Sequence, residues 1–164
     1  MTFTIRDPQP HDAATIADLH VATWKEAYAH LLSDDYFSEE YVEGRHRMWH
    51  DLLARTRDDM TVRVAERDGS IIGFALTGSS SGPEADEAPR DRMLHAIYVL
   101  SAHYGTGAGQ ALLDAALGDA PAMLWVAKEN PRAIAFYLRN GFQFDGVEQT
   151  DPHTPMITDA RMLR

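Results

Sequence analysis

The stretch HYGTGAGQALL, His103 to Leu113, sets three alternate glycines directly before an apolar run with helical spacing. The first turn of a helix carries unpaired N–H groups and a partial positive charge, so it can hold an anion. Because glycine has no Cβ, an anionic ligand can approach the backbone closely at Gly105, Gly107 and Gly109. The stretch therefore predicts a binding site for a phosphate-like group at the start of a helix.

Two other kinds of phosphate-binding loop fit this stretch poorly. A P-loop requires a lysine directly after its glycines, whereas Gln110 and Ala111 follow here. A dinucleotide-binding turn has the pattern G-x-G-x-x-G near the start of a βαβ unit, whereas this loop has G-x-G-x-G and lies far along the chain. Taken alone, the loop also fits a turn that merely joins a strand to a helix.

Strands and helices are expected to alternate around this loop. Short runs of β-forming residues predict strands at Phe3–Arg6, Thr61–Arg67, Ser70–Thr77, Met93–Val99, Ala122–Ala127, Phe142–Val147 and Ile157–Leu163. Runs with helical spacing predict helices at Asp12–Leu32, Asp34–Ala54 (with a break near Tyr41–Gly44), Gly107–Leu117 and Asn130–Asn140.

Turn and cap residues mark several ends of these elements. The pair Asp68-Gly69 is a favourable hairpin turn between two of the strands. Asp12 and Asn130 are candidate N-caps, and Gly141 is a C-terminal stop. The polar segment Gly78–Asp91 is expected to be a mobile loop.

The composition is that of a globular protein. With 164 residues, 45% of them hydrophobic and 24% charged, the chain is expected to form one domain over residues 1–164. No apolar run reaches the length of a membrane span, and the first residues lack the core of a signal peptide, so a cytoplasmic protein is expected. The lack of cysteine excludes disulfides, thiolate metal sites and a cysteine nucleophile.

The net charge limits the kinds of molecule that the chain is expected to bind. A formal net charge of −10 argues against a general nucleic-acid surface, which needs a basic stripe. An anionic ligand must therefore be held by local dipoles, while a cationic second substrate is weakly favoured by the average field. His46 and His50 are spaced like two metal ligands, but nothing supplies the rest of a site, so no metal is expected and the pair is interpreted as a solvated helix face.

Two stretches together carry a family resemblance. MLHAIYVLSAHYGTGAGQALLDAAL, Met93–Leu117, followed by LWVAKENPRAIAFYLRNGFQFDG, Leu124–Gly146, resembles the GNAT superfamily of N-acetyltransferases. The motifs R/Q-x-x-G-x-G/A and N-x-x-A-x-x-F-Y-x-x-x-G-F are matched in order and spacing. HVATWKEAYAHLL, His20–Leu32, is more weakly similar to the first helix of a bacterial small-molecule branch. The resemblance implies an α/β (α+β) fold: a mixed, mostly antiparallel sheet flanked by helices, with the cofactor at the split between the central strands.

The resemblance also implies which anion the glycine loop holds, namely the pyrophosphate of coenzyme A, with acetyl-CoA as co-substrate. In the family the strand that matches Ile97–Val99 pairs its backbone with the pantetheine arm, and Asn130 touches the cofactor besides capping its helix. One departure is that Tyr104 stands where the motif usually has Arg or Gln. The implied cofactor-binding residues are Ile97, Tyr98, Val99, Tyr104, Gly105, Thr106, Gly107, Ala108, Gly109, Gln110, Asn130 and Tyr137.

Acetyl transfer to an amine requires proton handling. An amine of pKa near 10.4 is only about 1 part in 2,500 neutral at pH 7, so transfer gains from a base. Tyr137 matches the family's acid, which returns a proton to the leaving thiolate. The family often has a base, a Glu, where Met93 stands; His95, two residues on, is either the base or an ordinary half-buried histidine. A strand N–H near Ile97–Val99 could stabilise the thioester oxyanion.

The expected function is therefore an acetyl-CoA-dependent N-acetyltransferase that acts on a primary amine of a small molecule. A non-catalytic module that binds coenzyme A as a sensor is the alternative, because Met93 replaces the usual Glu. Aromatic side chains of the first two helices, mostly core by expectation, lie in the region that lines the acceptor cleft in the family. The identity of the acceptor and the formation of a homodimer stay open, and neither a nucleic acid nor a membrane is expected as a partner.

Overall fold

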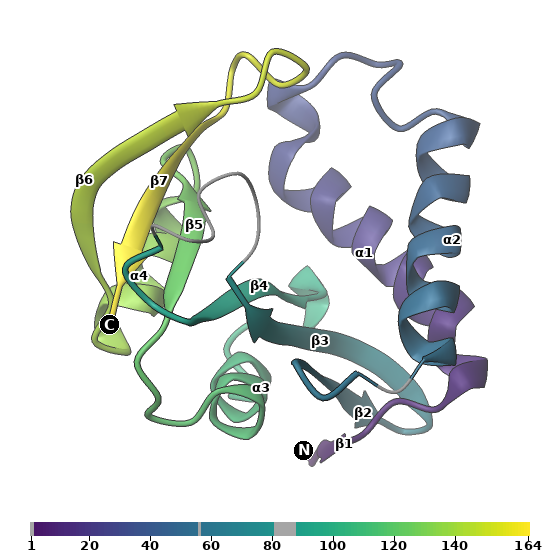
Figure 1. The fold of residues 1–164 in the computed structure, drawn as a ribbon. Helices are drawn as coiled ribbons and strands as arrows, with labels where there is room; N and C mark the ends of the chain where they lie inside the picture. The colour runs from purple at the N-terminus through teal and green to yellow at the C-terminus, as the bar shows by residue number, and fades with distance from the viewer. Residues whose placement is uncertain (1, 56, 81–87) are drawn as a thin grey trace.

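The computed structural model describes residues 2–55, 57–80 and 88–164, and within these residues seven strands form one sheet in the order β1-β2-β3-β4-β5-β7-β6 (Figure 1). The strands are β1 (Thr4–Arg6), β2 (Met60–Arg67), β3 (Ser70–Ser79), β4 (Arg92–Val99), β5 (Met123–Ala127), β6 (Gln143–Thr150) and β7 (Thr158–Leu163). Their pairing is antiparallel except between β4 and β5. The expected mixed, mostly antiparallel sheet is confirmed.

The hairpin of β2 and β3 forms where its turn residues predict it. Asp68 and Gly69 have φ values of 51° and 77°, both in the left-handed region that a two-residue hairpin turn requires. At the end away from this turn, β3 ends at Ser79. The expected mobile loop Gly78–Asp91 falls largely on residues 81–87, which lie outside the described residues.

The helices differ from expectation at their ends. They are α1 (Ala13–Tyr28), α2 (Glu39–Ala54), α3 (Ala108–Ala116) and α4 (Pro131–Arg139), with short 3-10 turns η1 (Pro10–Asp12), η2 (Ala29–Leu31) and η4 (Ser101–His103). The expected break near Tyr41–Gly44 is wrong, because α2 runs through it. This helix begins at Glu39, where the hydroxyl of Ser38 accepts a hydrogen bond from the Tyr41 N–H at 3.2 Å.

Asp12 is at the expected N-cap position of α1, but its side chain makes no cap bond there, for a tertiary reason. Its carboxylate accepts hydrogen bonds from the Arg6 guanidinium at 2.8 Å and from the Gln9 N–H at 2.7 Å, and makes no cap bond to α1. The hydrogen bond from Arg6 is the main cause that lowers the pKa of Asp12. Asp12 therefore ties the first strand to the start of α1.

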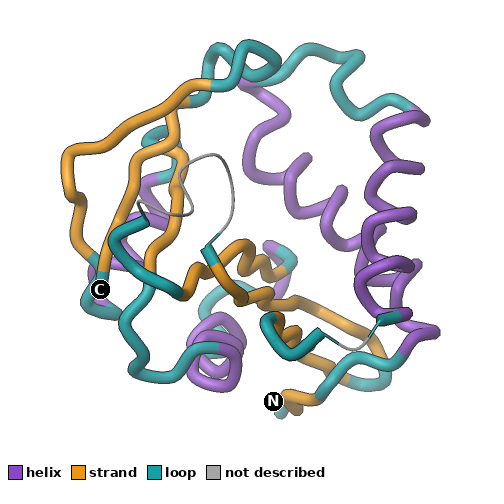
Figure 2. Tube along the Cα trace, in the orientation of Figure 1, coloured by secondary structure: helices purple, strands orange, loops and turns teal. Residues whose placement is uncertain are grey.

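Helices cover both faces of the sheet (Figure 2). Side chains of a strand alternate between the two faces, and the only exception in the β2–β3 hairpin is the register shift that leaves Ile72 of β3 without a partner in β2. Val64, Phe74 and Leu76 pack in one cluster with α1 and α2, while Ala65, Ile72 and Ala75 pack in another with α3. A third cluster joins α3 and α4 to β5 and β7. None of the helices in the described residues is long and apolar enough to cross a membrane.

The sheet splits between its two parallel strands. One register pair, Met93 with Met123, joins β4 to β5, whereas β5 pairs with β7 along its whole length, from Met123–Leu163 to Ala127–Asp159. Beyond Met93 the strands β4 and β5 diverge, as Figure 1 shows. The split places an opening between the carboxyl ends of the two central strands.

Candidate active site

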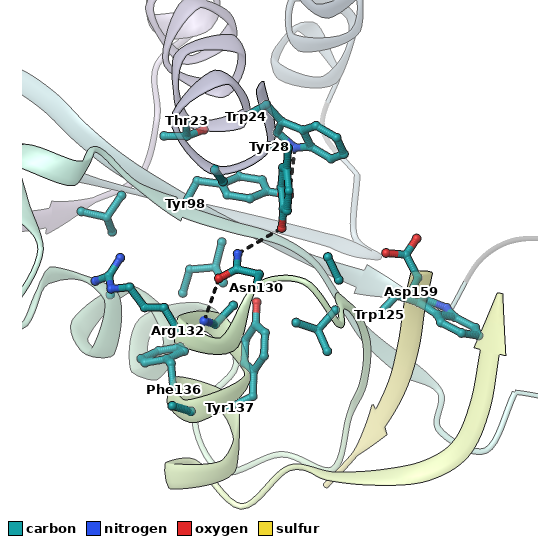
Figure 3. A pocket seen from close by; sticks show the side chains of 18 of the residues that line it. Thr23, Trp24, Tyr28, Tyr98, Trp125, Asn130, Arg132, Phe136, Tyr137 and Asp159 are labelled. Atoms are coloured by element: carbon teal, nitrogen blue, oxygen red, sulfur yellow. Dashed lines mark hydrogen bonds between the residues drawn. The ribbon is translucent and has the colours of Figure 1, made fainter. Parts of the chain in front are cut away.

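A cavity of about 480 Å³ lies at this split and is lined from both sides of the sheet. Its walls come from α1, β4, the glycine loop, β5, α4 and β7 (Figure 3). The lining includes eight of the residues that the sequence predicts for the site, namely His95, Ile97, Tyr98, Val99, Tyr104, Gly109, Asn130 and Tyr137. The cavity thus brings together the two motifs that lie far apart in the sequence.

The remaining predicted residues do not line the cavity: Gly105, Thr106 and Gly107 lead into α3, Gln110 lies in its first turn, and Ala108 is buried in the core. Gly105 and Gly107 have φ values of 75° and 88°, and a Cβ at either position would meet nothing within 4 Å. Gly107 is the N-cap of α3. The loop therefore exposes backbone to open space at the start of a helix, the geometry that suits an anion.

Tyr104 contacts Arg132, a cavity residue that the sequence motifs do not predict. The guanidinium carbon of Arg132, in the first turn of α4, lies 3.1 Å from the centroid of the Tyr104 ring. An arginine over an aromatic face is held by cation–π attraction. A positive charge thus lies beside the position where the family motif usually has Arg or Gln. Its only signal in the sequence is its place two residues after the N-cap Asn130.

Asn130 links the two sides of the split. Its side-chain oxygen accepts a hydrogen bond from the Ala133 N–H at 3.1 Å, which confirms it as the N-cap of α4. Its side-chain amide donates to the hydroxyl of Tyr28, at the end of α1, at 3.1 Å. Both bonds are drawn in Figure 3. The start of α4 is therefore fixed against α1 across the cavity.

Tyr137 is a buried tyrosine whose hydroxyl points into the cavity (Figure 3). Its ring packs against Phe136 and Phe142 with centroids 5.6 Å and 6.0 Å away. Within the described residues, no hydrogen bond to this hydroxyl is found. Burial raises the pKa of Tyr137 above its ordinary value, so the hydroxyl keeps its proton at neutral pH.

His95 occupies a β-bulge on β4. Thr77 pairs with Leu94 and Leu76 with Ala96, so His95 is the extra residue between them. Its Nε2 lies 3.0 Å from the carbonyl oxygen of Ser79. Because a carbonyl only accepts hydrogen bonds, Nε2 carries the proton in the neutral ring and Nδ1 keeps the lone pair. Burial lowers the pKa of His95 below its ordinary value.

The other wall of the cavity is aromatic. Trp24 and Tyr28 of α1 lie with ring centroids 4.7 Å apart, and the indole N–H of Trp24 donates to the Tyr98 hydroxyl at 3.1 Å. Trp125 of β5 lines the cavity as well. Trp49, by contrast, is fully buried in the core. Of the two helical tryptophans, Trp24 therefore lines the cavity and Trp49 belongs to the core.

The fold and these motifs match known proteins. The model of the Acetyltransferase (GNAT) family matches residues 24–142 of the chain. The chain belongs to this family. It is 31% identical over 142 residues to the uncharacterized N-acetyltransferase YuaI of Bacillus subtilis, covering 82% of this chain and 76% of that protein. It is 29% identical over 149 residues to the probable N-acetyltransferase Rv2775 of Mycobacterium tuberculosis, covering 87% and 80%.

A solved structure with the same fold is the PaiA N-acetyltransferase of Thermoplasma acidophilum in complex with coenzyme A. The likeness has a TM-score of 0.68 at 23% identity, and it covers 100% of this chain and 99% of that one. The expectations of a GNAT fold and of an acetyltransferase are confirmed.

In this GNAT chain the described residues contain no group of three metal-ligating side chains. His46, one of the two histidines spaced like metal ligands, contacts Asp18 at 2.8 Å.

Proposed function

We propose that this GNAT protein transfers the acetyl group of acetyl-CoA to a primary amine of a small molecule. When bound, acetyl-CoA supplies the acetyl group as a thioester. The observation that carries the proposal is the split itself. Beyond Met93, β4 no longer pairs with β5, and the glycine loop, α4 and Tyr137 meet around one cavity at that place. The size of the cavity, about 480 Å³, falls in the range of small-molecule sites.

Each part of the site fits one part of coenzyme A. On the side of β4 that faces the split, the backbone of Ile97–Val99 has no register partner in β5, so it is available to the amides of a pantetheine arm. The N–H groups between Tyr104 and Gln110 lie at the start of α3, where a pyrophosphate is stabilised by the helix dipole. Arg132, held over Tyr104, adds a full positive charge beside that loop.

The proton-handling groups lie on two sides of the cavity. Tyr137, on α4, is the proton donor to the leaving thiolate. Its raised pKa means that the hydroxyl carries its proton at neutral pH. His95 accepts through Nδ1, since Nε2 is committed to Ser79. His95 also borders a second cavity, of about 530 Å³. An N–H of Ile97–Val99 that points into the split would stabilise the thioester oxygen as it becomes negative.

The experiment that tests the function combines binding and turnover. Coenzyme A and acetyl-CoA are expected to raise the melting temperature, while ATP and NAD at equal concentration are not, because only a ligand of the folded state stabilises it. Thiol release is then followed with a panel of primary amines. An equal shift with ATP would reject the cofactor. A shift with coenzyme A but no thiol release with any amine would favour the sensor alternative, which the Met93 position supports.

The role of His95 is tested by His95→Gln, which keeps an amide donor for the Ser79 carbonyl but cannot titrate. A base must be deprotonated to act, so wild-type kcat/KM should rise with pH through the pKa of His95. Since burial lowers that pKa, the rise is expected below pH 6.5. With one amine used throughout, His95→Gln should lose this limb and about tenfold in kcat/KM at pH 7. An unchanged profile would make His95 a packing residue and leave the proton to water.

A further inference from the structure

The cavity carries opposite charges on its two sides. Arg132 and Arg139 line it from α4, whereas Asp159 lines it from β7. In Figure 3, Arg132 lies on one side of Asn130 and Tyr28, and Asp159 lies on the other. Arg132 lies over Tyr104 of the glycine loop and therefore belongs with the proposed cofactor phosphates. The carboxylate therefore faces the part of the cavity that is left for the acceptor.

Asp159 is held in place by the sheet but has no counter-charge of its own. It pairs with Ala127, the last residue of β5, so its side chain shares a face with Trp125 two residues before. Arg161 also lies on this face, but its guanidinium contacts Asp145 at 2.7 Å. Among the described residues, no hydrogen bond or ion pair to the Asp159 side chain is found.

The surroundings of Asp159 favour a cation. Burial and the nearby Glu129 and Asp151 raise the pKa of Asp159. A bound cation would stabilise the ionised carboxylate and lower this pKa again. Glu129 is occupied, because its carboxylate accepts from the Thr158 N–H at 2.8 Å. Trp24, Tyr28 and Trp125 line the same cavity, and aromatic rings can attract a cation through cation–π contacts, as the Trp125 ring does with Arg161 at 5.9 Å.

We propose that Asp159 binds a second, non-reacting ammonium group of the acceptor, so that the acceptor class is an aliphatic diamine or polyamine. One amine group is acetylated beside Tyr137, while the other is held by Asp159 and the aromatic wall. An α-amino acid is disfavoured, because its carboxylate would add a negative charge close to Asp159. This inference rests on the proposed acetyl transfer and adds the acceptor to it.

The test compares 1,5-diaminopentane with pentylamine, which has the same chain but one charge. The wild type should prefer the diamine about tenfold in kcat/KM. Asp159→Asn, which keeps the shape and removes the charge, should raise the KM for the diamine about tenfold, change the monoamine less than twofold and leave the KM for acetyl-CoA unchanged. Asp119→Asn is the matched control, since Asp119 is exposed, does not line the cavity and is not among the groups that raise the pKa of Asp159. It should leave the preference intact.

Calorimetry of 1,5-diaminopentane with the CoA-saturated protein separates this inference from the proposed function. Diamine binding that weakens tenfold in Asp159→Asn, without acetylation of any amine, would keep the site and reject the transfer reaction. Acetylation of 1,5-diaminopentane and pentylamine with equal kcat/KM would keep the reaction and overturn the assignment of Asp159. An equal loss of kcat/KM for the two substrates in Asp159→Asn would do the same. Equal melting temperatures of the variants and the wild type would show that the folds are comparable.

Discussion

Replacing Tyr137 by phenylalanine is expected to lower kcat about 10²-fold, with the KM for acetyl-CoA and the melting temperature nearly unchanged. The change removes one oxygen that points into the cavity, and the ring keeps its contacts with Phe136 and Phe142. A larger loss is not expected, because a thiol of pKa near 8.5 is already a fair leaving group. Steady-state kinetics with saturating acetyl-CoA and amine measure the effect.

Tyr28→Phe is the matched control for this prediction. Tyr28 lines the same cavity, and its hydroxyl accepts a hydrogen bond from the Asn130 amide at 3.1 Å. Removal of that hydroxyl should cost stability, because a half-buried amide donor loses its partner, while kcat should fall less than about threefold. If both variants lose kcat equally, the effect of Tyr137 is one of cavity polarity and not of proton donation.

Parts of the fold that depend on local chemistry could be predicted from the sequence. The turn at Asp68-Gly69 and the N-cap Asn130 are decided by φ preference and by a hydrogen bond within a few residues. Asp12 looks the same locally, but its carboxylate is taken by Arg6, a partner supplied by the tertiary fold. In α2, Gly44 suggests a break, yet the helix continues toward Trp49, which is fully buried in the core. Packing overrides propensity there.

The same distinction applies to the site. The glycine loop and the position of Tyr137 follow from motifs that are contiguous in sequence. His95 could be placed on its strand, but the bulge around it could not, because an extra residue leaves no mark in the apolar pattern. Its effect is visible in the packing, where Leu94 and Ile97 join one cluster although they are three residues apart. Arg132 and Asp159 carry no motif at all, and only the topology brings them to one cavity.

Replacing Gly109 by valine is expected to weaken coenzyme A binding about 30-fold, or about 2 kcal/mol, while the fold is kept. Gly109 lies in the first turn of α3 with helical backbone, so a side chain causes no strain there, unlike at Gly107 with its φ of 88°. A Cβ at Gly109 would stand 3.8 Å from the Phe136 ring and 4.0 Å from Val99, an ordinary contact. The two further methyl groups of valine would then fill the space between α3 and β4, where the cofactor is proposed to pass.

Two other variants make the Gly109 result decisive, with Kd measured by calorimetry. Gly109→Ala adds only the Cβ that fits, so it should weaken binding less than valine does. Gly44→Val makes the same substitution within α2, where the added Cβ meets only the end of the Arg47 side chain at 3.8 Å, and Kd should not change. If Gly109→Val binds coenzyme A within twofold of the wild type, the glycines serve the turn and not the phosphates. The anion would then be held by the N–H groups that remain in the loop and by Arg132, which is too exposed to supply more than a small part of the affinity.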